Sequence, residues 1–385
     1  MKGVDEDEAA GDTSYKHCAM EVTPFSPSGE IVLNDTMMKH FKQSRFFDLE
    51  PYSGEGKGLP KQASVISAPT VESIDYHESE PFLVCATTDH VLRIFDTRKG
   101  EPIGIGLSKK YGVSSVRFTP HPTCVIYAST KFDQSSNEYL SNHAIRDQST
   151  HDEQYIRFFK GHTEKVLNIE MSKSTDTFFS ASMDKTVRQW DLRQEREVLH
   201  MDIAKEPLTL QPYVAVDKQD MLLAVGHGGG LVKLYDPRNI SKPFHTIAGA
   251  SPEFAPSIFC MKFSNTADMI AVGIQRKIYL YDCSTQGCKV NPNEVHKPMH
   301  VFVIGNEDFN EKMEFSFSPD DQYILSGHQD GSVRIWRTKD GVEVTCLKGN
   351  TGKGVDILRC LKFNPHEAQF ATGSLFTKLW NLEYY

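Results

Sequence analysis

The sequence predicts an all-β protein in which seven four-stranded units form a ring closed by a strand from the N-terminal side. Three observations lead to this prediction. A short alternating run that ends in an aromatic residue recurs along the chain, and a second alternating run precedes most of its copies. The last copy ends only a few residues before the end of the sequence. Such units must stack around an axis to bury their faces, as the blades of a β-propeller do.

The recurring run alternates with the two-residue period of a β-strand. Its clear copies are DHVLRIFD (89–96), DKTVRQWD (184–191), GGLVKLYD (229–236), QRKIYLYD (275–282), DGSVRIWR (330–337) and SLFTKLWN (374–381). Successive copies lie 44–55 residues apart, except for a first gap of 95 residues. We therefore expect a degenerate seventh copy within that gap, at EYLS (138–141), after the strand-like CVIYAST (124–130).

The second alternating run contains a polar turn with Pro or Asp. Its examples are VRFTPHPTCVIYAS (116–129), MKFSNTADMIAVG (261–273), FSFSPDDQYILSG (315–327) and LKFNPHEAQFATG (361–373). Repetition at two places in each period strengthens the prediction of a seven-bladed β-propeller.

The two ends of the chain have different expected roles. Too few residues follow 381 for an outer strand, so HFKQSRFFDL (40–49) is expected to complete the last blade and remove its exposed edge. The propeller is predicted over residues 37–385. Residues 1–36 are expected to form an acidic disordered tail, since residues 1–35 carry −6 of the formal net charge of −9. Loop insertions are expected at 51–70 and 142–154.

Composition excludes several classes of protein. A chain with 39% hydrophobic and 10% aromatic residues can form a large core. The remaining net charge of −3 gives no broad positive field for duplex DNA. An acidic N-terminus predicts no secretory signal, and the apolar runs fall far short of the ~20 residues of a membrane span. The eight cysteines form no C-x-x-C pair, which favours packed thiols in a reducing compartment.

The third unit carries a set of polar residues beside its aromatic. Gly161 and His162 precede one strand, Ser180 lies in the next, and Asp184 and Trp190 follow. The pattern resembles the WD-repeat family. The resemblance implies that His162, Ser180, Asp184 and Trp190 form a hydrogen-bonded tetrad, which would satisfy buried polar groups and fix blade geometry. The rival interpretation is a hydrolase triad of His162, Ser180 and Asp184.

Further segments narrow the resemblance. They are SKKYGV (108–113), EYLS (138–141), YIRFFKGH (155–162), DTFFSASMDKTVRQWDLR (176–193) and LVKLYDPR (231–238). Together they resemble the small WD-repeat subunit shared by Set-type (COMPASS-like) histone methyltransferase complexes and by phosphatase and RNA 3′-end-processing complexes that terminate transcription. The resemblance covers about residues 37–382. It implies a non-catalytic nuclear scaffold that links a methyltransferase or phosphatase assembly to RNA polymerase II.

Motifs for catalysis, metals or cofactors are scarce. GNTGKG (349–354) lacks the spacer and the Ser or Thr of a phosphate-binding loop. GHGGG (226–230) falls at a hairpin, where glycine permits positive φ. His296 and His300 are separated by Pro298, which argues against a helical zinc pair. We expect no enzyme activity, no metal, no cofactor, no membrane association and no direct sequence-specific nucleic acid binding.

An alternative function comes from an aromatic-Asp-x-Arg sequence that resembles a feature of substrate receptors of cullin-type ubiquitin ligases. Its copies are FDTR (95–98), WDLR (190–193) and YDPR (235–238). The second copy makes Trp190, Asp191 and Arg193 the alternative adaptor residues. The competing interpretation is that Asp and Arg cap the strand and pair with the neighbouring blade.

Loops that join an outer strand to the next inner strand gather on one face of a propeller. In one such loop Lys109 and Lys110 stand beside Tyr111, and charge-assisted hydrogen bonds from them can hold a phosphorylated or acidic peptide. Lys160 and Lys165 occupy the equivalent loop one blade on. The resemblance implies the phosphorylated tail of RNA polymerase II as ligand; a solvated turn is the alternative.

Overall fold

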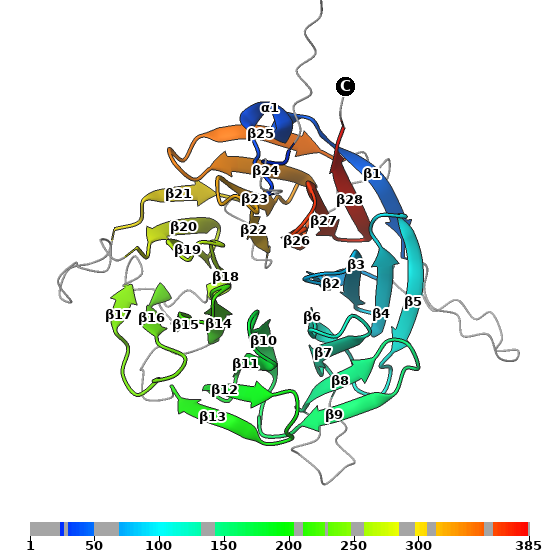
Figure 1. Cartoon of the computed structure of the whole chain (residues 1–385), viewed down its shortest axis with the longest axis vertical. Coiled ribbons are helices and arrows are strands. Elements are labelled where there is room, and N and C mark those ends of the chain that lie inside the picture. Colours follow the sequence, from blue (N-terminus) through cyan, green and yellow to red (C-terminus); the bar gives the residue numbers. More distant parts are fainter. Residues whose placement is uncertain are drawn as a thin grey trace, which may run out of the picture.

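The computed structural model describes residues 24–26, 30–49, 69–131, 143–203, 211–227, 230–247, 258–284, 297–305, 313–349 and 357–383. These residues form seven four-stranded sheets around a central channel (Figure 1). The predicted seven-bladed β-propeller is confirmed. None of the helices in the described ranges is long and apolar enough to cross a membrane.

In blades one to six the chain runs from the innermost strand to the outermost. Blade one contains β2 (Val71–Tyr76), β3 (Phe82–Thr87), β4 (Val91–Asp96) and β5 (Glu101–Leu107); blade two β6 (Ser114–Phe118), β7 (Cys124–Ala128), β8 (Ile145–Ser149) and β9 (Tyr155–Phe159); blade three β10 (Val166–Met171), β11 (Thr177–Ser182), β12 (Thr186–Asp191) and β13 (Glu197–Asp202). Blade four contains β14 (Tyr213–Val216), β15 (Leu223–Gly226), β16 (Val232–Tyr235) and β17 (His245–Ile247); blade five β18 (Ile258–Phe263), β19 (Met269–Ile274), β20 (Lys277–Asp282) and β21 (His300–Val303); blade six β22 (Phe315–Phe317), β23 (Tyr323–Gly327), β24 (Ser332–Arg337) and β25 (Glu343–Lys348). Blade seven contains β26 (Cys360–Phe363), β27 (Gln369–Gly373), β28 (Phe376–Leu382) and β1 (Phe41–Asp48).

Burial differs with position in the blade because each blade is packed between two neighbours. The second strand of blade one, β3, is buried at every position but its first, and the third, β4, is buried throughout. The outer strand β13 alternates between exposed and more buried residues. Middle strands therefore read as almost continuous apolar runs, whereas outer strands keep the two-residue alternation.

Blade seven is completed from the N-terminal side, as predicted. Strand β1 pairs antiparallel with β28, from Phe41 opposite Leu382 to Asp48 opposite Phe376. The ring of Phe41 is buried, with its centroid 5.2 Å from that of Phe370. This pairing covers the edge of β28 and joins the two ends of the propeller.

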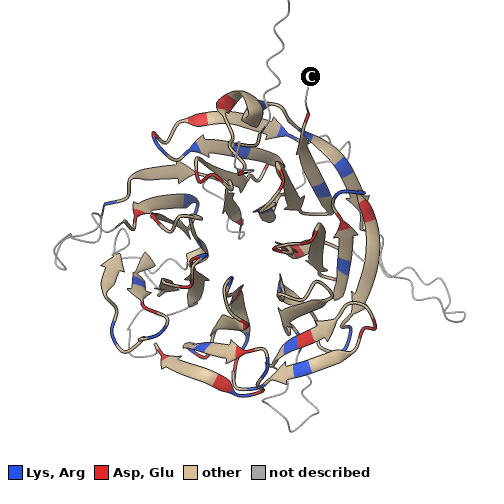
Figure 2. Cartoon of the chain, viewed as in Figure 1, with Lys and Arg blue, Asp and Glu red and all other residues tan. Residues whose placement is uncertain are grey.

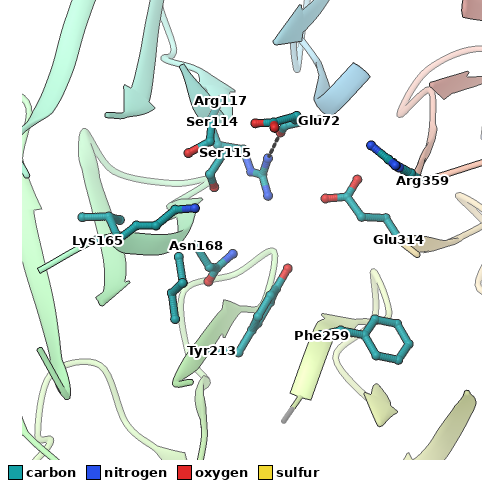
Figure 3. A pocket seen from close by; sticks show the side chains of 13 residues that line it. Glu72, Ser114, Ser115, Arg117, Lys165, Asn168, Tyr213, Phe259, Glu314 and Arg359 are labelled. Atoms are coloured by element: carbon teal, nitrogen blue, oxygen red, sulfur yellow. Dashed lines mark hydrogen bonds between the residues drawn. The ribbon is translucent and has the colours of Figure 1, made fainter. Parts of the chain in front are cut away.

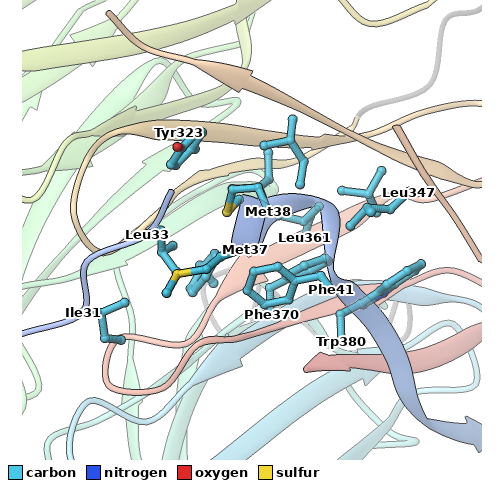
Figure 4. Close-up of a cluster of buried hydrophobic side chains, with 14 of the residues drawn as sticks. Ile31, Leu33, Met37, Met38, Phe41, Tyr323, Leu347, Leu361, Phe370 and Trp380 are labelled. Carbon is cyan, nitrogen blue, oxygen red and sulfur yellow. The ribbon is translucent and has the colours of Figure 1, made fainter. Parts of the chain in front are cut away.

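The disordered tail expected over residues 1–36 is contradicted by the structure in its last part. Residues 30–36 are ordered and lead into the short helix α1 (Asp35–Lys39), which lies against β25. The buried side chains of Ile31 and Leu33 join a core cluster shared with blades six and seven (Figure 4). The carboxylate of Asp35 pairs with Arg337, which shows why net charge alone misjudged this segment. Residues 1–23 and 27–29 lie outside the described residues.

The loop insertion expected at 142–154 is wrong where this segment forms a strand. Residues 145–149 form β8, the third strand of blade two, in register with β7 from Cys124–Ser149 to Ala128–Ile145. Its side chains Arg146, Asp147 and Gln148 are polar yet buried, so the apolar alternation that marks other third strands is missing. The degenerate copy of the recurring run was expected at 138–141, but the third strand of blade two is β8, so that prediction is wrong. Residues 138–141 and most of the insertion expected at 51–70 lie outside the described residues.

Candidate functional site

The four polar residues predicted as a tetrad meet inside blade three. His162, in the loop before β10, has Nδ1 2.8 Å from Asp184 Oδ2 and Nε2 2.7 Å from Ser180 Oγ. Trp190 Nε1 donates to the same Ser180 oxygen at 2.8 Å. The chain of contacts ties the loop to β11 and β12 and the turn between them.

The tetrad is closed to solvent. Burial lowers the pKa of His162, and although burial acts to raise the pKa of Asp184, hydrogen bonds from His162 and Thr186 hold it below its usual value. Ser180 is completely buried, and its oxygen already accepts the indole N–H of Trp190. A hydroxyl in that position braces the blade and is not exposed to solvent.

The turn at Lys109–Tyr111 contacts blade two through the ring of Tyr111, a contact that the sequence did not indicate. Lys109 and Lys110 are exposed, and Lys110 Nζ lies 5.1 Å from the ring centroid of Tyr111. The guanidinium of Arg146, on β8, lies only 3.6 Å from the same centroid. Tyr111 therefore anchors the turn on the blade while both lysines extend from it.

Two basic residues at this turn were missed by sequence reasoning. Exposed Lys131 donates through Nζ to the backbone oxygen of Lys109 at 2.6 Å, which adds a third ammonium group. Arg146 is completely buried and is also near the ring of Phe158, at 5.5 Å. No local signal predicts Lys131, because it follows β7 and reaches the turn only through the fold.

The other two predicted lysines lie on the same face, since both belong to the loop from β9 to β10 that corresponds to the loop from β5 to β6. Lys165 lines the mouth of the central channel, whereas Lys160 is exposed just after β9. The structure thus places Lys165 in a different part of the face from the turn at Lys109–Tyr111.

The three aromatic-Asp-x-Arg sequences cap the turns that follow their strands. Asp96, Asp191 and Asp236 each accept the backbone N–H of the arginine two residues later, at 2.8–3.0 Å. Arg98 also pairs with Glu367 of blade seven, at 2.6 Å. The side chains of the other arginines contact residues of their own blades; Arg193 pairs with Asp176, at 2.9 Å, and Arg238 Nη2 lies 3.4 Å from Met221 Sδ. The aspartate therefore caps the turn at all three sites, and among the described residues Arg98 alone of these arginines pairs with a neighbouring blade.

The motifs considered for phosphate or metal lie largely outside the described residues. Most of GNTGKG and all of His296 lie outside the described residues, and His300 on β21 has its Nε2 3.2 Å from the backbone oxygen of Lys339. In the described ranges, His, Cys, Asp and Glu side chains form no group of three that could hold a metal ion.

Charged residues also line the channel, on inner strands where sequence reasoning looked only for core. They occupy the same register position in five blades: Asp75, Arg117, Glu170, Lys262 and Lys362. Figure 2 shows acidic and basic positions on the strands around this opening. In these five inner strands the recurring signal is a charged residue two places before the first residue of the polar turn that follows the strand.

These channel residues form ion pairs between blades. Glu170 lies 3.4 Å from Arg117 and 3.0 Å from Lys262, and Asp75 pairs with Lys362. Although burial acts to raise it, Lys262 and Arg117 hold the pKa of Glu170 at about 2. The pairs join inner strands that share no backbone hydrogen bonds.

Comparison with protein families gives a match to the model of the WD domain, G-beta repeat, at residues 153–191 and 313–337. The first match includes the tetrad and the second contains β24. Both therefore fall on blades that the structure assigns independently.

Similar proteins match most of the chain. Protein ANTHESIS POMOTING FACTOR 1 of Arabidopsis thaliana is 31% identical over 320 residues, which are 80% of this chain and 86% of the relative. WD repeat-containing protein 82 of Drosophila melanogaster is 31% identical over 313 residues, 80% of this chain and 90% of the relative. COMPASS component SWD2 of Saccharomyces cerevisiae is 24% identical over 314 residues, 78% of this chain and 88% of the relative.

Proposed function

Because this chain belongs to the WD-repeat family, we propose that it is a non-catalytic scaffold subunit of nuclear chromatin-modifying complexes. The observation that carries the proposal is similarity along about four-fifths of the chain to relatives that include one named as a COMPASS component. The closed tetrad supports a non-catalytic role, since the Ser180 hydroxyl is buried. The scaffold would join a Set-type methyltransferase or a phosphatase assembly to RNA polymerase II and the termination of transcription.

Purification of the tagged full chain from nuclei, followed by mass spectrometry, tests the scaffold role. We expect subunits of a Set-type methyltransferase or of a phosphatase scaffold to co-purify. The alternative function, substrate receptor of a cullin-type ubiquitin ligase, predicts a cullin adaptor instead.

A variant with Arg98→Ala and Arg193→Ala separates the two functions. Both arginine side chains are mostly exposed, so the fold should tolerate their loss. The scaffold function predicts the same partners for this variant. Recovery of a cullin adaptor with the wild-type chain and its loss with the variant would establish the alternative.

We further propose that the turn at Lys109–Tyr111 binds a phosphorylated or acidic peptide, with the phosphorylated polymerase tail as ligand. Three ammonium groups support this site, because Lys131 reaches the backbone of the predicted pair. Arg146 holds Tyr111 against the blade, so the turn that carries the exposed lysines is fixed in position. Lys160 and Lys165 add positive charge to the same face.

Calorimetry with phosphorylated and unphosphorylated polymerase-tail peptides tests this site. The double variant Lys109→Glu with Lys110→Glu should abolish binding of the phosphorylated peptide, and added salt should weaken the wild-type interaction. The matched control reverses Lys218 and Lys339, which are exposed on the opposite face. Equal binding of both peptides, or indifference to the Lys109 and Lys110 reversal, would leave the turn as a solvated loop and the scaffold role alone.

A further inference from the structure

The charges around the central channel nearly compensate one another. The cavity of about 410 Å³ at one end of the channel is lined by Arg117, Lys165 and Arg359 as well as by Glu72 and Glu314 (Figure 3). This mixture gives the cavity no strong preference for a cation or an anion. The outer rim of the ring differs, because blade five presents an uncharged strand edge there.

The outermost strand of a blade has no neighbour on its far side, and charged residues or proline usually protect such an edge from pairing with other chains. Among the outer strands that the structure describes, β1, β5, β9, β13 and β25 each contain at least one charged residue, and β17 spans only three residues. Strand β21 contains no Asp, Glu, Lys or Arg (Figure 2). Its edge therefore lacks the usual protection.

The backbone of β21 leaves donors and acceptors open on this edge. The strand pairs antiparallel with β20, and the N–H of Ile304 just after it donates to the carbonyl of Arg276 at 2.9 Å. Backbone groups of alternate residues point to the same side, so the even-numbered residues of β21 face β20. Val301 and Val303 direct their N–H and C=O groups outward, where no described residue pairs with them.

The side chains beside this edge form an apolar strip with basic ends. Met299, Val301 and Val303 alternate along the chain and are 45%, 44% and 55% exposed. Exposed Lys297 precedes the strip, and exposed Lys277 lies opposite Val303 at its other end. Neither lysine has an ion pair among the described residues.

These charges indicate which occupant suits the edge. A second copy paired edge to edge would bring lysines to lysines in either strand direction, and like charges repel across a strand pair. The acid of β20, Asp282, accepts the backbone N–H of Ser284 at 2.8 Å and caps a turn. A partner strand with acidic residues at its ends meets complementary charge instead.

We propose that β21 is a docking edge, which takes an extended segment of a protein partner as a fifth strand of blade five. Val301 and Val303 exchange backbone hydrogen bonds with the segment, and their side chains pack against its apolar residues at alternate positions. Acidic residues at the ends of the segment pair with Lys277 and Lys297. The docking edge lies on the outer rim and is independent of the turn at Lys109–Tyr111.

A synthetic heptapeptide tests the docking edge when it has an aspartate at each end and three valines alternating with two threonines between them. Fluorescence anisotropy with the full chain should show about tenfold tighter binding of this peptide than of the same peptide with lysine at each end. Hydrogen exchange at the amides of Val301 and Val303 should slow when the aspartate-ended peptide is added, because these amides gain acceptors.

Methylation of the peptide backbone separates strand pairing from simple charge attraction. When valine lies opposite valine, the N–H groups of the peptide valines face β21. Methylation of the three valine nitrogens should therefore abolish binding. Methylation of the two threonine nitrogens, which face away, is the matched control and should be tolerated.

Variants of the chain test the same contacts. Val301→Lys places a charge on the edge and should abolish binding, whereas Val198→Lys, at a 54% exposed valine of β13, should leave binding unchanged. Lys277→Glu with Lys297→Glu should reverse the preference in favour of the lysine-ended peptide. That reversal keeps the test decisive even if Val301→Lys folds poorly.

Three results would overturn the proposal: no binding of the aspartate-ended peptide, equal binding of the two peptides, or binding that survives methylation of the valine nitrogens. A wild-type dimer in sedimentation that Val301→Lys dissociates would assign the edge to a second copy instead. The Lys109 and Lys110 reversal should leave binding of these peptides unchanged, so the docking edge and the phosphopeptide turn can fail separately.

Discussion

Blades two and three share the same strand register, but the larger and the smaller side chain of one buried pair are exchanged between their second and third strands. In blade three the small Ser180 on β11 accepts a hydrogen bond from the large Trp190 on β12, at 2.8 Å. The equivalent positions of blade two hold the large Tyr127 and the smaller Gln148, also joined at 2.8 Å. Both blades therefore keep a hydrogen bond and a filled volume at this point, although only one keeps the repeat motif.

The two blades also hold their loops differently. In blade three His162 and Asp184 tie the loop to the strands. In blade two the guanidinium of Arg146 lies 3.6 Å from the ring centroid of Tyr111, which belongs to the corresponding loop. The comparison shows that different chemistry can fix the same loop, so loss of the motif does not imply loss of order.

The largest expected effect comes from truncating the aromatic of blade three. Trp190→Ala should reduce the free energy of unfolding by about 3–5 kcal/mol, because it leaves a cavity where the indole is completely buried. Gln148→Ala, its counterpart, should cost about 1–2 kcal/mol through loss of the bond to Tyr127. Urea unfolding of both variants measures the difference; equal losses would mean that the two positions carry similar packing.

Removal of the histidine should have the next largest effect. His162→Ala removes one hydrogen-bond partner from Ser180 and one from Asp184 and leaves a gap where a buried ring stood, so it should cost about 2–4 kcal/mol. Lys109 precedes buried Val113 by as many residues as His162 precedes Val166, so Lys109→Ala is the matched control, with a change of about 0.5 kcal/mol or less. A His162→Ala protein of unchanged stability that loses a hydrolytic activity would instead support the triad.

The smallest expected effect is a pH-dependent gain in blade two. Burial raises the pKa of Asp147 to about 6, opposed by Arg157 and His121. Because this value exceeds that of the unfolded chain, its contribution to stability is complete below about pH 4 and is lost as pH rises through 6. Asp147→Asn should therefore stabilise the protein by about 1–3 kcal/mol at pH 7. Melting temperatures measured from pH 4 to 8 should be less pH-dependent in the variant; parallel curves would contradict the assignment.

Sequence patterns predicted the elements whose burial follows the repeat. The closing strand was predictable because β1 alternates and β28 would otherwise leave an open edge. Strand β8 was not, since Arg146, Asp147 and Gln148 replace the apolar run with polar residues that only the surrounding aromatics and strands make tolerable. The N-terminal boundary was misjudged for a similar reason, because Asp35 is paired with Arg337.

The residues of the candidate site likewise fall into those that the sequence could place and those that only the fold brings together. The tetrad lies within one blade and was implied by the resemblance of that blade to the WD-repeat family, so the sequence could indicate that His162 lies beside Ser180. The arrival of Lys131 at Lys109, and the pairing of Glu170 with Lys262, join residues that lie far apart in the chain or in different blades.

The sequence by itself determined the repeat, the number of blades and the closure, because these depend on periodic burial that every blade expresses locally. Only the tertiary structure decided which charges are paired and which are not. The channel cations are neutralised by Glu170 and Asp75, while Glu314 remains without an ion pair among the described residues. Charge pairing depends on distances across the ring, and those distances exist only after the seven blades have closed.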